Sequence, residues 1–156
     1  MHPTSESYSF IKILGSGAMK SGAPEYGRTF IVDIRDVTTA HVAAGFSEEA
    51  DGRYIVMGHN TNMLAFAKVI GEKFPDYPLP KSTVPRFILC LILAPYIGMT
   101  RHQVWRNGGH TAGMDNSKSK KDLKIEYHPM EETFPDMFAH MLEGGLIPSV
   151  GAAEAK

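Results

Sequence analysis

The chain has 156 residues, of which 43% are hydrophobic and 21% charged, and its formal net charge is −1. This composition excludes a disordered chain, and the lack of net positive charge argues against nucleic-acid binding. A single cysteine, Cys90, excludes an internal disulfide framework and fits a reducing compartment.

A short helix is predicted over residues 5–14, because apolar side chains recur there at helical spacing. A glycine-rich loop follows over residues 15–22. It is similar to a phosphate-binding loop, but Met19 stands where that motif has glycine and the spacing is one residue short. We therefore interpret it as a surface loop.

The stretch 29–45 predicts a strand followed directly by a helix. Up to Ile34 it is aromatic and β-branched, which favours a strand that is hydrophobic throughout, as in a parallel sheet. Asp36 is the expected N-cap of the helix and Gly45 its end. His41 is expected to be packed and hydrogen-bonded on the helix face.

The remaining segments alternate between strand and helix patterns. They are a strand at 53–57, helices at 60–74, 87–97, 100–106 and 116–123, an extended segment at 125–127, and a last helix from Pro129 to Gly144. The nearly all-apolar helix at 87–97 is expected to be buried on most sides. Two or three strands predict an α/β fold, but too few for an independent doubly wound sheet. We expect one domain over residues 1–150 and a flexible tail at 151–156.

The sequence predicts neither a signal peptide nor a membrane-spanning helix. The first residues lack a basic region followed by an apolar stretch, so a signal peptide is not predicted. The most apolar run, 87–99, is shorter than the roughly 20 residues that span a bilayer. These patterns predict a cytoplasmic protein with no membrane and no nucleic-acid partner.

Few side chains suggest catalysis. Tyr8 and Lys12 have the spacing that places a phenol and an ammonium one helical turn apart, but a pattern of two fixed residues recurs by chance. The histidines are scattered without His-Glu-x-x-His, so no metal site is predicted. Asp33 and Arg35 are expected either to form an ion pair or to line a cleft.

Five motifs occur in order along the chain: Val32–His41, Gly52–Ile55, Phe74–Pro80, Met114–Ile125 and Tyr127–Thr133. Together they resemble the extended short-chain dehydrogenase/reductases (the NAD-dependent epimerase/dehydratase superfamily), in particular the dihydroflavonol-reductase-like branch. Lys124 stands where this family usually has glycine. The resemblance implies NAD(P)-dependent reduction of an aldehyde or ketone, or the reverse oxidation.

The family's glycine turn and its Ser/Tyr/Lys catalytic set precede the segment that this chain matches. The chain therefore resembles the C-terminal half only: an incomplete Rossmann-type unit made of the late elements of the sheet, plus a mostly helical substrate-binding subdomain. A cofactor, NADP or NAD, is implied by the resemblance alone, and most of its binding site is expected to be absent from this chain. We assign no catalytic, cofactor-binding or metal-binding residue, and whether this chain is an enzyme by itself stays open.

Substrate contacts are expected from aromatic and acidic residues in stretches that match the family's substrate subdomain or its border: Tyr8, Phe10, Tyr26, Phe30, Asp33 and Trp105. Two functions remain open. The chain is either the substrate-binding C-terminal portion of an NAD(P)-dependent carbonyl reductase or a non-catalytic binding or interaction module without the cofactor half. The expected partners are a small carbonyl compound and either the missing N-terminal half or a second copy, joined through exposed strand edges.

Overall fold

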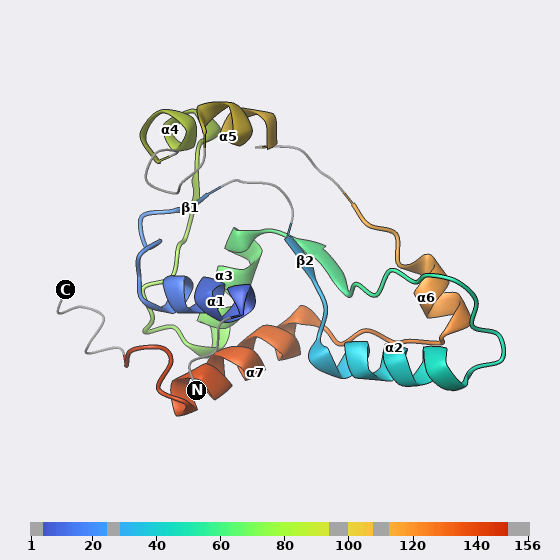
Figure 1. Cartoon of the computed structure of the whole chain (residues 1–156). Helices are drawn as coiled ribbons and strands as arrows, with labels where there is room; N and C mark the ends of the chain where they lie inside the picture. The colour runs from blue at the N-terminus through green and yellow to red at the C-terminus, as the bar shows by residue number, and fades with distance from the viewer. Residues whose placement is uncertain (1–4, 25–28, 94–99, 108–112, 150–156) are drawn as a thin grey trace.

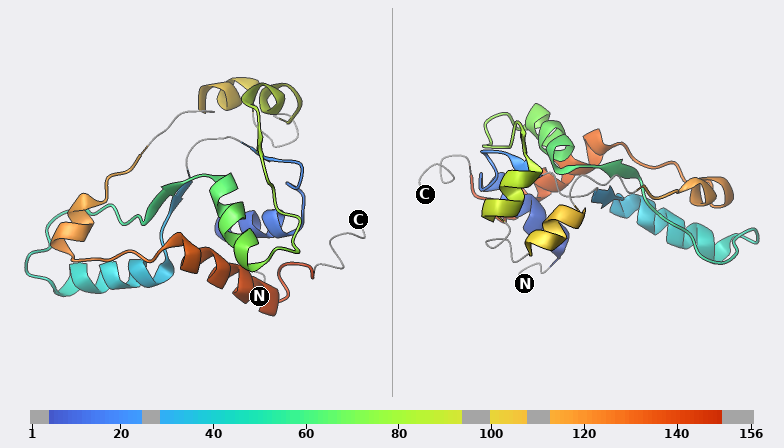
Figure 2. Two further views of the ribbon diagram at one scale, coloured as in Figure 1. Left: turned by 180° about the vertical axis from the view of Figure 1, so that it is seen from behind. Right: turned by 90° about the horizontal axis from the view of Figure 1, so that it is seen from above.

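A computed structural model of the chain describes residues 5–24, 29–93, 100–107 and 113–149 (Figure 1). Its elements, in chain order, are α1 (Glu6–Gly15), β1 (Ala23–Pro24), β2 (Thr29–Ile31), α2 (Ile34–Phe46), β3 (His59–Thr61), α3 (Met63–Lys73), β4 (Thr83–Val84), α4 (Arg86–Ile88), the π-helix η1 (Leu89–Leu93), α5 (Arg101–Asn107), α6 (Ser117–Asp122) and α7 (Met130–Glu143). Figures 1 and 2 show α1, α3 and α7 in a central group, with α2 and α6 side by side at one end. The helices α4 and α5 lie together, apart from both of these groups.

The strands form two small sheets. β2 and β3 are antiparallel, with Phe30 opposite Asn60, whereas β1 and β4 are parallel. Within the described residues each sheet has two strands. The prediction of an α/β protein, with an incomplete Rossmann-type unit and a mostly helical remainder, is confirmed.

The position of the second predicted strand is wrong, because β2 pairs with β3 and not with residues 53–57. In that segment Tyr54 and Val56 are half-buried and Ile55 is exposed, so the alternation that suggested a strand is present. The carbonyl of Met57, however, accepts a hydrogen bond from the side chain of Asn116. Alternation shows which face is buried, but not which group supplies the hydrogen bonds.

The main core lies between α1, α3 and α7. Its fully buried members include Leu14, Phe66, Ile70 and Phe138. The ring of Phe138 lies 4.9 Å from that of Phe74, measured between ring centroids, and the same distance from that of Tyr77. Aromatic side chains bury much apolar area for their number, so this cluster contributes strongly to the hydrophobic stabilisation of the fold.

The predicted burial of residues 87–97 is wrong for the part that the structure describes. Leu89 is buried against Val104 of α5, but Phe87 and Leu91 are each 60% exposed. The apolar run predicted a helix correctly, yet α5 covers only one side of it. Residues 94–99 lie outside the described part.

The glycine-rich loop does not form a phosphate cradle. It consists of turns between α1 and β1, so no helix N-terminus follows it within the described residues. Gly17 has φ +77° and packs against Pro78, where a Cβ would come 2.7 Å from the proline Cγ. The interpretation as a surface loop is therefore confirmed.

Lys124 has a left-handed backbone with φ +54°. Because L-residues with a side chain are strained there by about 1–2 kcal/mol, the family's glycine at this position has a physical reason. We expect Lys124→Gly to raise the free energy of unfolding by about 0.5–1 kcal/mol. Lys121→Gly, inside α6, is the matched control and should lower it by about 1 kcal/mol. Urea denaturation measures both, and a loss of stability in Lys124→Gly would contradict the expectation.

Candidate functional site

A groove runs between α1, the β2–α2 connection and α7. It consists of two adjoining cavities, of about 430 and 620 Å³, which share the lining residues Ser7, Val32, Thr133 and Met137. The elements that form it come from the beginning and the end of the chain. This is a size that accommodates a drug-sized organic molecule.

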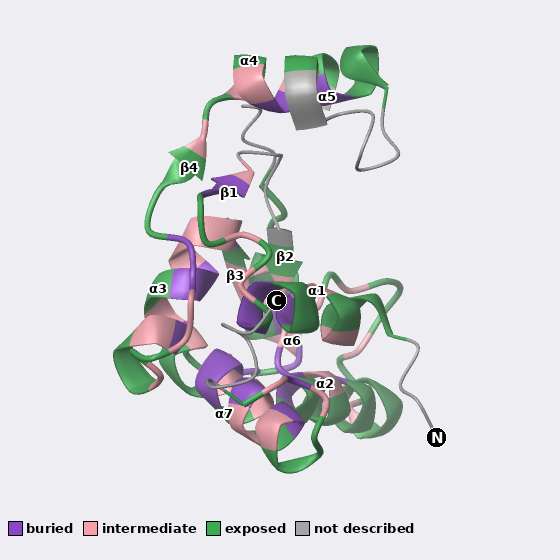
Figure 3. Ribbon diagram, turned by 90° about the vertical axis from the view of Figure 1, so that its left-hand side faces the viewer, coloured by how far each residue is buried: buried purple, intermediate pink, exposed green. Residues whose placement is uncertain are grey.

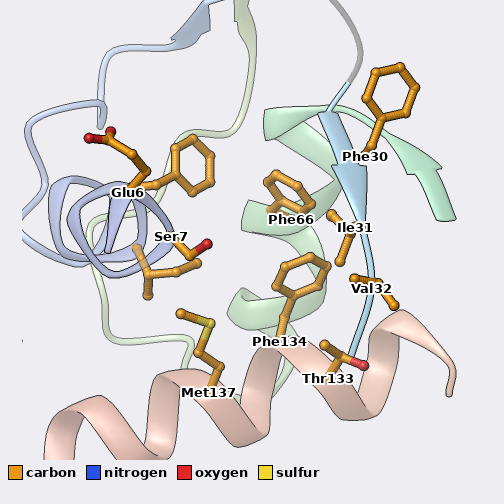
Figure 4. A pocket seen from close by; sticks show the side chains of 11 residues that line it. Glu6, Ser7, Phe30, Ile31, Val32, Phe66, Thr133, Phe134 and Met137 are labelled. Carbon is orange, nitrogen blue, oxygen red and sulfur yellow. The ribbon is translucent and has the colours of Figure 1, made fainter. Parts of the chain in front are cut away.

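The first cavity is apolar. Figure 4 shows the rings of Phe66 and Phe134 at its centre, between α1 and β2, with Met137 beside them and Phe30 at the outer edge. The ring centroids of Phe66 and Phe134 are 4.4 Å apart, and Phe10 meets Phe66 edge-on at 5.4 Å. Such a wall of aromatic faces and edges suits a flat, apolar ligand.

The second cavity ends at an acid–arginine pair. Arg35 donates to both carboxylate oxygens of Asp33, from Nε at 2.9 Å and from a terminal nitrogen at 2.7 Å. Asp33 also caps α2 by accepting from the Arg35 backbone N–H, and it accepts from the hydroxyl of Thr133 at 2.8 Å. Four donors therefore fill both oxygens of this carboxylate, which leaves it no free lone pair for a ligand.

The electrostatics follow from these contacts. The side-chain hydrogen bond from Arg35 holds the pKa of Asp33 well below its usual range, and the same bond raises the pKa of Arg35. Asp33 is thus a permanent anion that neither gives nor takes a proton at physiological pH. It fixes the junction between β2 and α2 instead of supplying acid–base chemistry.

This pair predicts a pH dependence. Because the pKa of Asp33 is depressed in the folded state, its charge stabilises the fold above the unfolded pKa of about 3.9, and this contribution is lost as the pH falls. Asp33→Asn keeps the helix cap and removes the charge, so it should cost about 1–2 kcal/mol at neutral pH. The cost should begin to shrink below about pH 5 and should keep shrinking until the pH falls through the depressed pKa of the folded-state carboxyl. Urea titrations measure it, with exposed Asp76→Asn as control, and a cost that does not change with pH would contradict it.

Asp36 is not the helix cap that the sequence predicted, since Asp33 has that role. The residue Asp36 is 1% exposed, and it accepts from the backbone N–H of His128 at 3.0 Å and from the His128 ring. The His59 ring donates to the His128 carbonyl at 2.8 Å. Asp36 therefore ties α2 to the segment that enters α7. The expected hydrogen bond of His41 is confirmed, since its ring bonds the Val37 carbonyl, but its expected packing is wrong because the residue is exposed.

The structure brings together four of the six predicted substrate residues. Phe10 and Phe30 line the apolar cavity, and Tyr8 and Asp33 line the polar one. Trp105 lines neither of these cavities, and Tyr26 lies outside the described residues. Thr133 and Met137 could not be predicted as lining residues, because no local pattern shows that a segment about one hundred positions after β2 returns to the end of that strand.

The N-termini of α2, α3 and α7 do not suit the pyrophosphate of a dinucleotide. A pyrophosphate binds free amides at a helix N-terminus, but the carboxylate of Asp33 occupies that position on α2 and Asn62 caps α3. The first turn of α7 contains Glu131 and Glu132, which repel an anion. In the described part of the chain, no three His, Cys, Asp or Glu side chains gather as metal ligands.

Comparisons with known proteins agree with this architecture. Anthocyanidin reductase from Vitis vinifera is 35% identical over 54 residues, which are 35% of this chain and 16% of that protein. NADPH-dependent methylglyoxal reductase GRE2 from Saccharomyces cerevisiae is 29% identical over 113 residues, 72% of this chain and 29% of the reductase. The crystal structure of gox2253 has the same fold, with a TM-score of 0.70 at 19% identity over 92% of this chain and 46% of that one. No protein-family model matches the chain.

The fold and the strand–helix junction at Asp33 define an α/β protein of the Rossmann type. These relatives are reductases, and in sequence the chain is similar to the extended short-chain dehydrogenase/reductases that its motifs indicated. It spans less than a third of the length of these curated relatives. None of the helices in the described ranges is long and apolar enough to cross a membrane.

Proposed function

We propose that the chain is the substrate-binding C-terminal portion of an NAD(P)-dependent carbonyl reductase. The observation that carries this proposal is the groove, because it joins an apolar aromatic cavity to a polar end at the family's own strand–helix motif. The relatives named above support the reaction class, since their names include an anthocyanidin reductase and an NADPH-dependent methylglyoxal reductase. An aldehyde or ketone with an aromatic body is the substrate class that fits.

The lining residues have different proposed roles in substrate binding. Phe10, Phe66 and Phe134 would stack against the apolar body of the substrate. Asp33 has no lone pair left, so it holds the groove in shape, while the hydroxyls of Ser7 and Tyr8 are among the donors of this cavity that can hydrogen-bond a substrate oxygen. Hydride transfer would need NADPH or NADH, and the N-termini of α2, α3 and α7 do not offer a pyrophosphate site. The chain alone is therefore proposed to bind substrate and not to turn it over.

A titration of the isotope-labelled full chain with cinnamaldehyde, followed by nuclear magnetic resonance, tests this function. Amide shifts are expected to concentrate on α1, the end of β2 and the first half of α7. Phe10→Ala should weaken binding several-fold, since stacking of one ring contributes about 0.5–1.5 kcal/mol. Ile13→Ala, an exposed position on the same helix, is the matched control and should leave binding unchanged. Shifts scattered over the whole chain, or equal effects of the two variants, would overturn the proposal.

A second candidate is a non-catalytic interaction module, which the surface of α2 favours. Ile34, Val42 and Phe46 are 74%, 56% and 87% exposed. Thr38 completes their four-residue spacing, so they lie on one stripe of the helix. Exposed apolar stripes of this kind commonly bind another protein surface. Light scattering should then show self-association that Val42→Glu with Phe46→Glu abolishes. A monomer at all concentrations would exclude association of this chain with itself.

A further inference from the structure

The pair formed by α4–η1 and α5 is set apart from the rest of the fold. Figures 1 and 3 show these helices at one end of the molecule, away from α1, α2 and α7. They have a small core of their own, in which Leu89 and Val104 are buried with Val84 and Cys90 at its edge. A surface on this pair therefore serves neither the groove nor the main core.

Three large apolar side chains of this pair face solvent. Phe87 and Leu91 are each 60% exposed, one helical turn apart, and Trp105 is 55% exposed. The guanidinium of Arg86 lies 4.2 Å from the centroid of the Trp105 ring. Leu89 and Val104 of the same pair are buried, so Phe87, Leu91 and Trp105 are the large apolar side chains that the packing of α5 on η1 leaves in solvent.

The charged residues in the segment that contains these side chains have one sign. Between Asp76 and Asp115 the sequence contains four cationic residues, Lys81, Arg86, Arg101 and Arg106, and no acidic residue at all. The rest of the chain holds all 17 acidic residues with the other 12 basic ones. Arg101 and Arg106 are both exposed on α5. An apolar surface whose own segment of the chain contributes cations and no acids is complementary to a surface that is apolar inside and anionic outside.

We propose that the exposed face of α4, η1 and α5 binds the surface of an anionic lipid bilayer. Phe87, Leu91 and Trp105 enter the boundary between headgroups and acyl chains, and Arg101 and Arg106 contact lipid phosphates. The indole suits this boundary because one edge is polar and the ring apolar. The stripe on α2 makes a useful contrast: it is equally apolar, but Glu48, Glu49 and Asp51 follow it directly.

This proposal differs from the sequence-based expectation of no membrane partner. That expectation depended on the length of the apolar run and on its burial. A surface contact needs neither a spanning length nor a buried helix, and the exposure of Phe87 and Leu91 became evident only in the fold.

Trp105 is the single tryptophan of the chain, so its fluorescence reports directly on this face. The full chain is mixed with vesicles of phosphatidylcholine alone or with phosphatidylglycerol added. With the anionic vesicles the emission should shift to shorter wavelength and be quenched by brominated acyl chains. The shift should be absent with phosphatidylcholine alone and should diminish as salt screens the charges. No shift with anionic vesicles would overturn the proposal.

Matched variants distinguish binding through this face from non-specific binding of the chain to vesicles. Arg101→Gln with Arg106→Gln should lower the partition coefficient about 20-fold or more, because each cation near an anionic surface contributes about 1 kcal/mol. Phe87→Ser with Leu91→Ser should reduce it at least about tenfold. The control for the apolar substitutions is Phe46→Ser on α2, and the control for the charge substitutions is Lys68→Gln with Lys121→Gln. Each control should change the partition coefficient less than twofold. Equal losses in variants and controls, at unchanged circular dichroism, would show binding elsewhere and refute the assignment to this face.

Discussion

Asp36→Ala is expected to lower the free energy of unfolding by about 2–4 kcal/mol, since it removes a buried charged acceptor and leaves its donors unpaired. The carboxylate is 1% exposed and accepts from both the backbone N–H and the ring of His128, 92 positions away in the sequence. Without it the backbone N–H of His128 keeps its desolvation cost but loses its partner. The link between α2 and the start of α7 is the part that should loosen first.

Urea denaturation followed by circular dichroism measures this loss. Asp51→Ala, at an exposed carboxylate, is the control and should change stability by less than about 0.5 kcal/mol. A double-mutant cycle with His128→Ala isolates the pair, and a coupling of about 1–3 kcal/mol is expected for residues in direct contact. An Asp36→Ala variant as stable as the control would show that the buried contact contributes nothing to the fold.

The same residue shows where sequence reasoning reached its limit. A short polar side chain at the junction of a strand and a helix predicts a cap, and both Asp33 and Asp36 satisfy that pattern. Only the path of the chain decides between them, because the partner of Asp36 is His128, which no local pattern connects to it. The helix itself and its approximate ends were predictable, whereas the role of each acid was not.

The apolar run at 87–97 illustrates a different limit. Hydrophobicity predicts that a segment prefers burial, but it does not supply the element that buries it. In this fold α5 covers Leu89 and leaves Phe87 and Leu91 exposed. In the candidate site, aromatic residues such as Phe10 and Phe30 could be named from their position near the family motif. Thr133 and Met137 could not, because they reach the groove through the tertiary packing of α7.

The motif that resembles the reductases and the hydrophobic core both contribute to the groove. The motif Val32–His41 places Asp33 at the start of α2, and Thr133 of the last helix bonds to it. One sequence motif thus sets the polar end of the groove, while the core between α1, α3 and α7 sets its apolar wall. Whatever binds in the groove therefore depends on the stability of that core.

Phe138→Ala tests this dependence and is expected to cost about 3–5 kcal/mol, the largest effect of any substitution considered. The ring is fully buried on α7 and contacts Phe74 and Tyr77. It also lies 3.2 Å from where a Cβ on Gly15 would be, so α1 and α7 approach each other closely there. Three helices and two rings fix the surroundings, so the space left by the ring cannot collapse fully.

Thermal and urea denaturation of Phe138→Ala measure the loss of unfolding free energy, and two further variants serve as comparisons. Phe138→Leu retains most of the volume and should cost about 1–1.5 kcal/mol. Phe46→Ala removes the same atoms from a position that is 87% exposed and should cost less than about 0.5 kcal/mol. Because α7 forms one wall of the groove, cinnamaldehyde binding should weaken in Phe138→Ala and remain in Phe46→Ala. If Phe138→Ala unfolds like the parent chain, the core between α1, α3 and α7 is not what stabilises the groove.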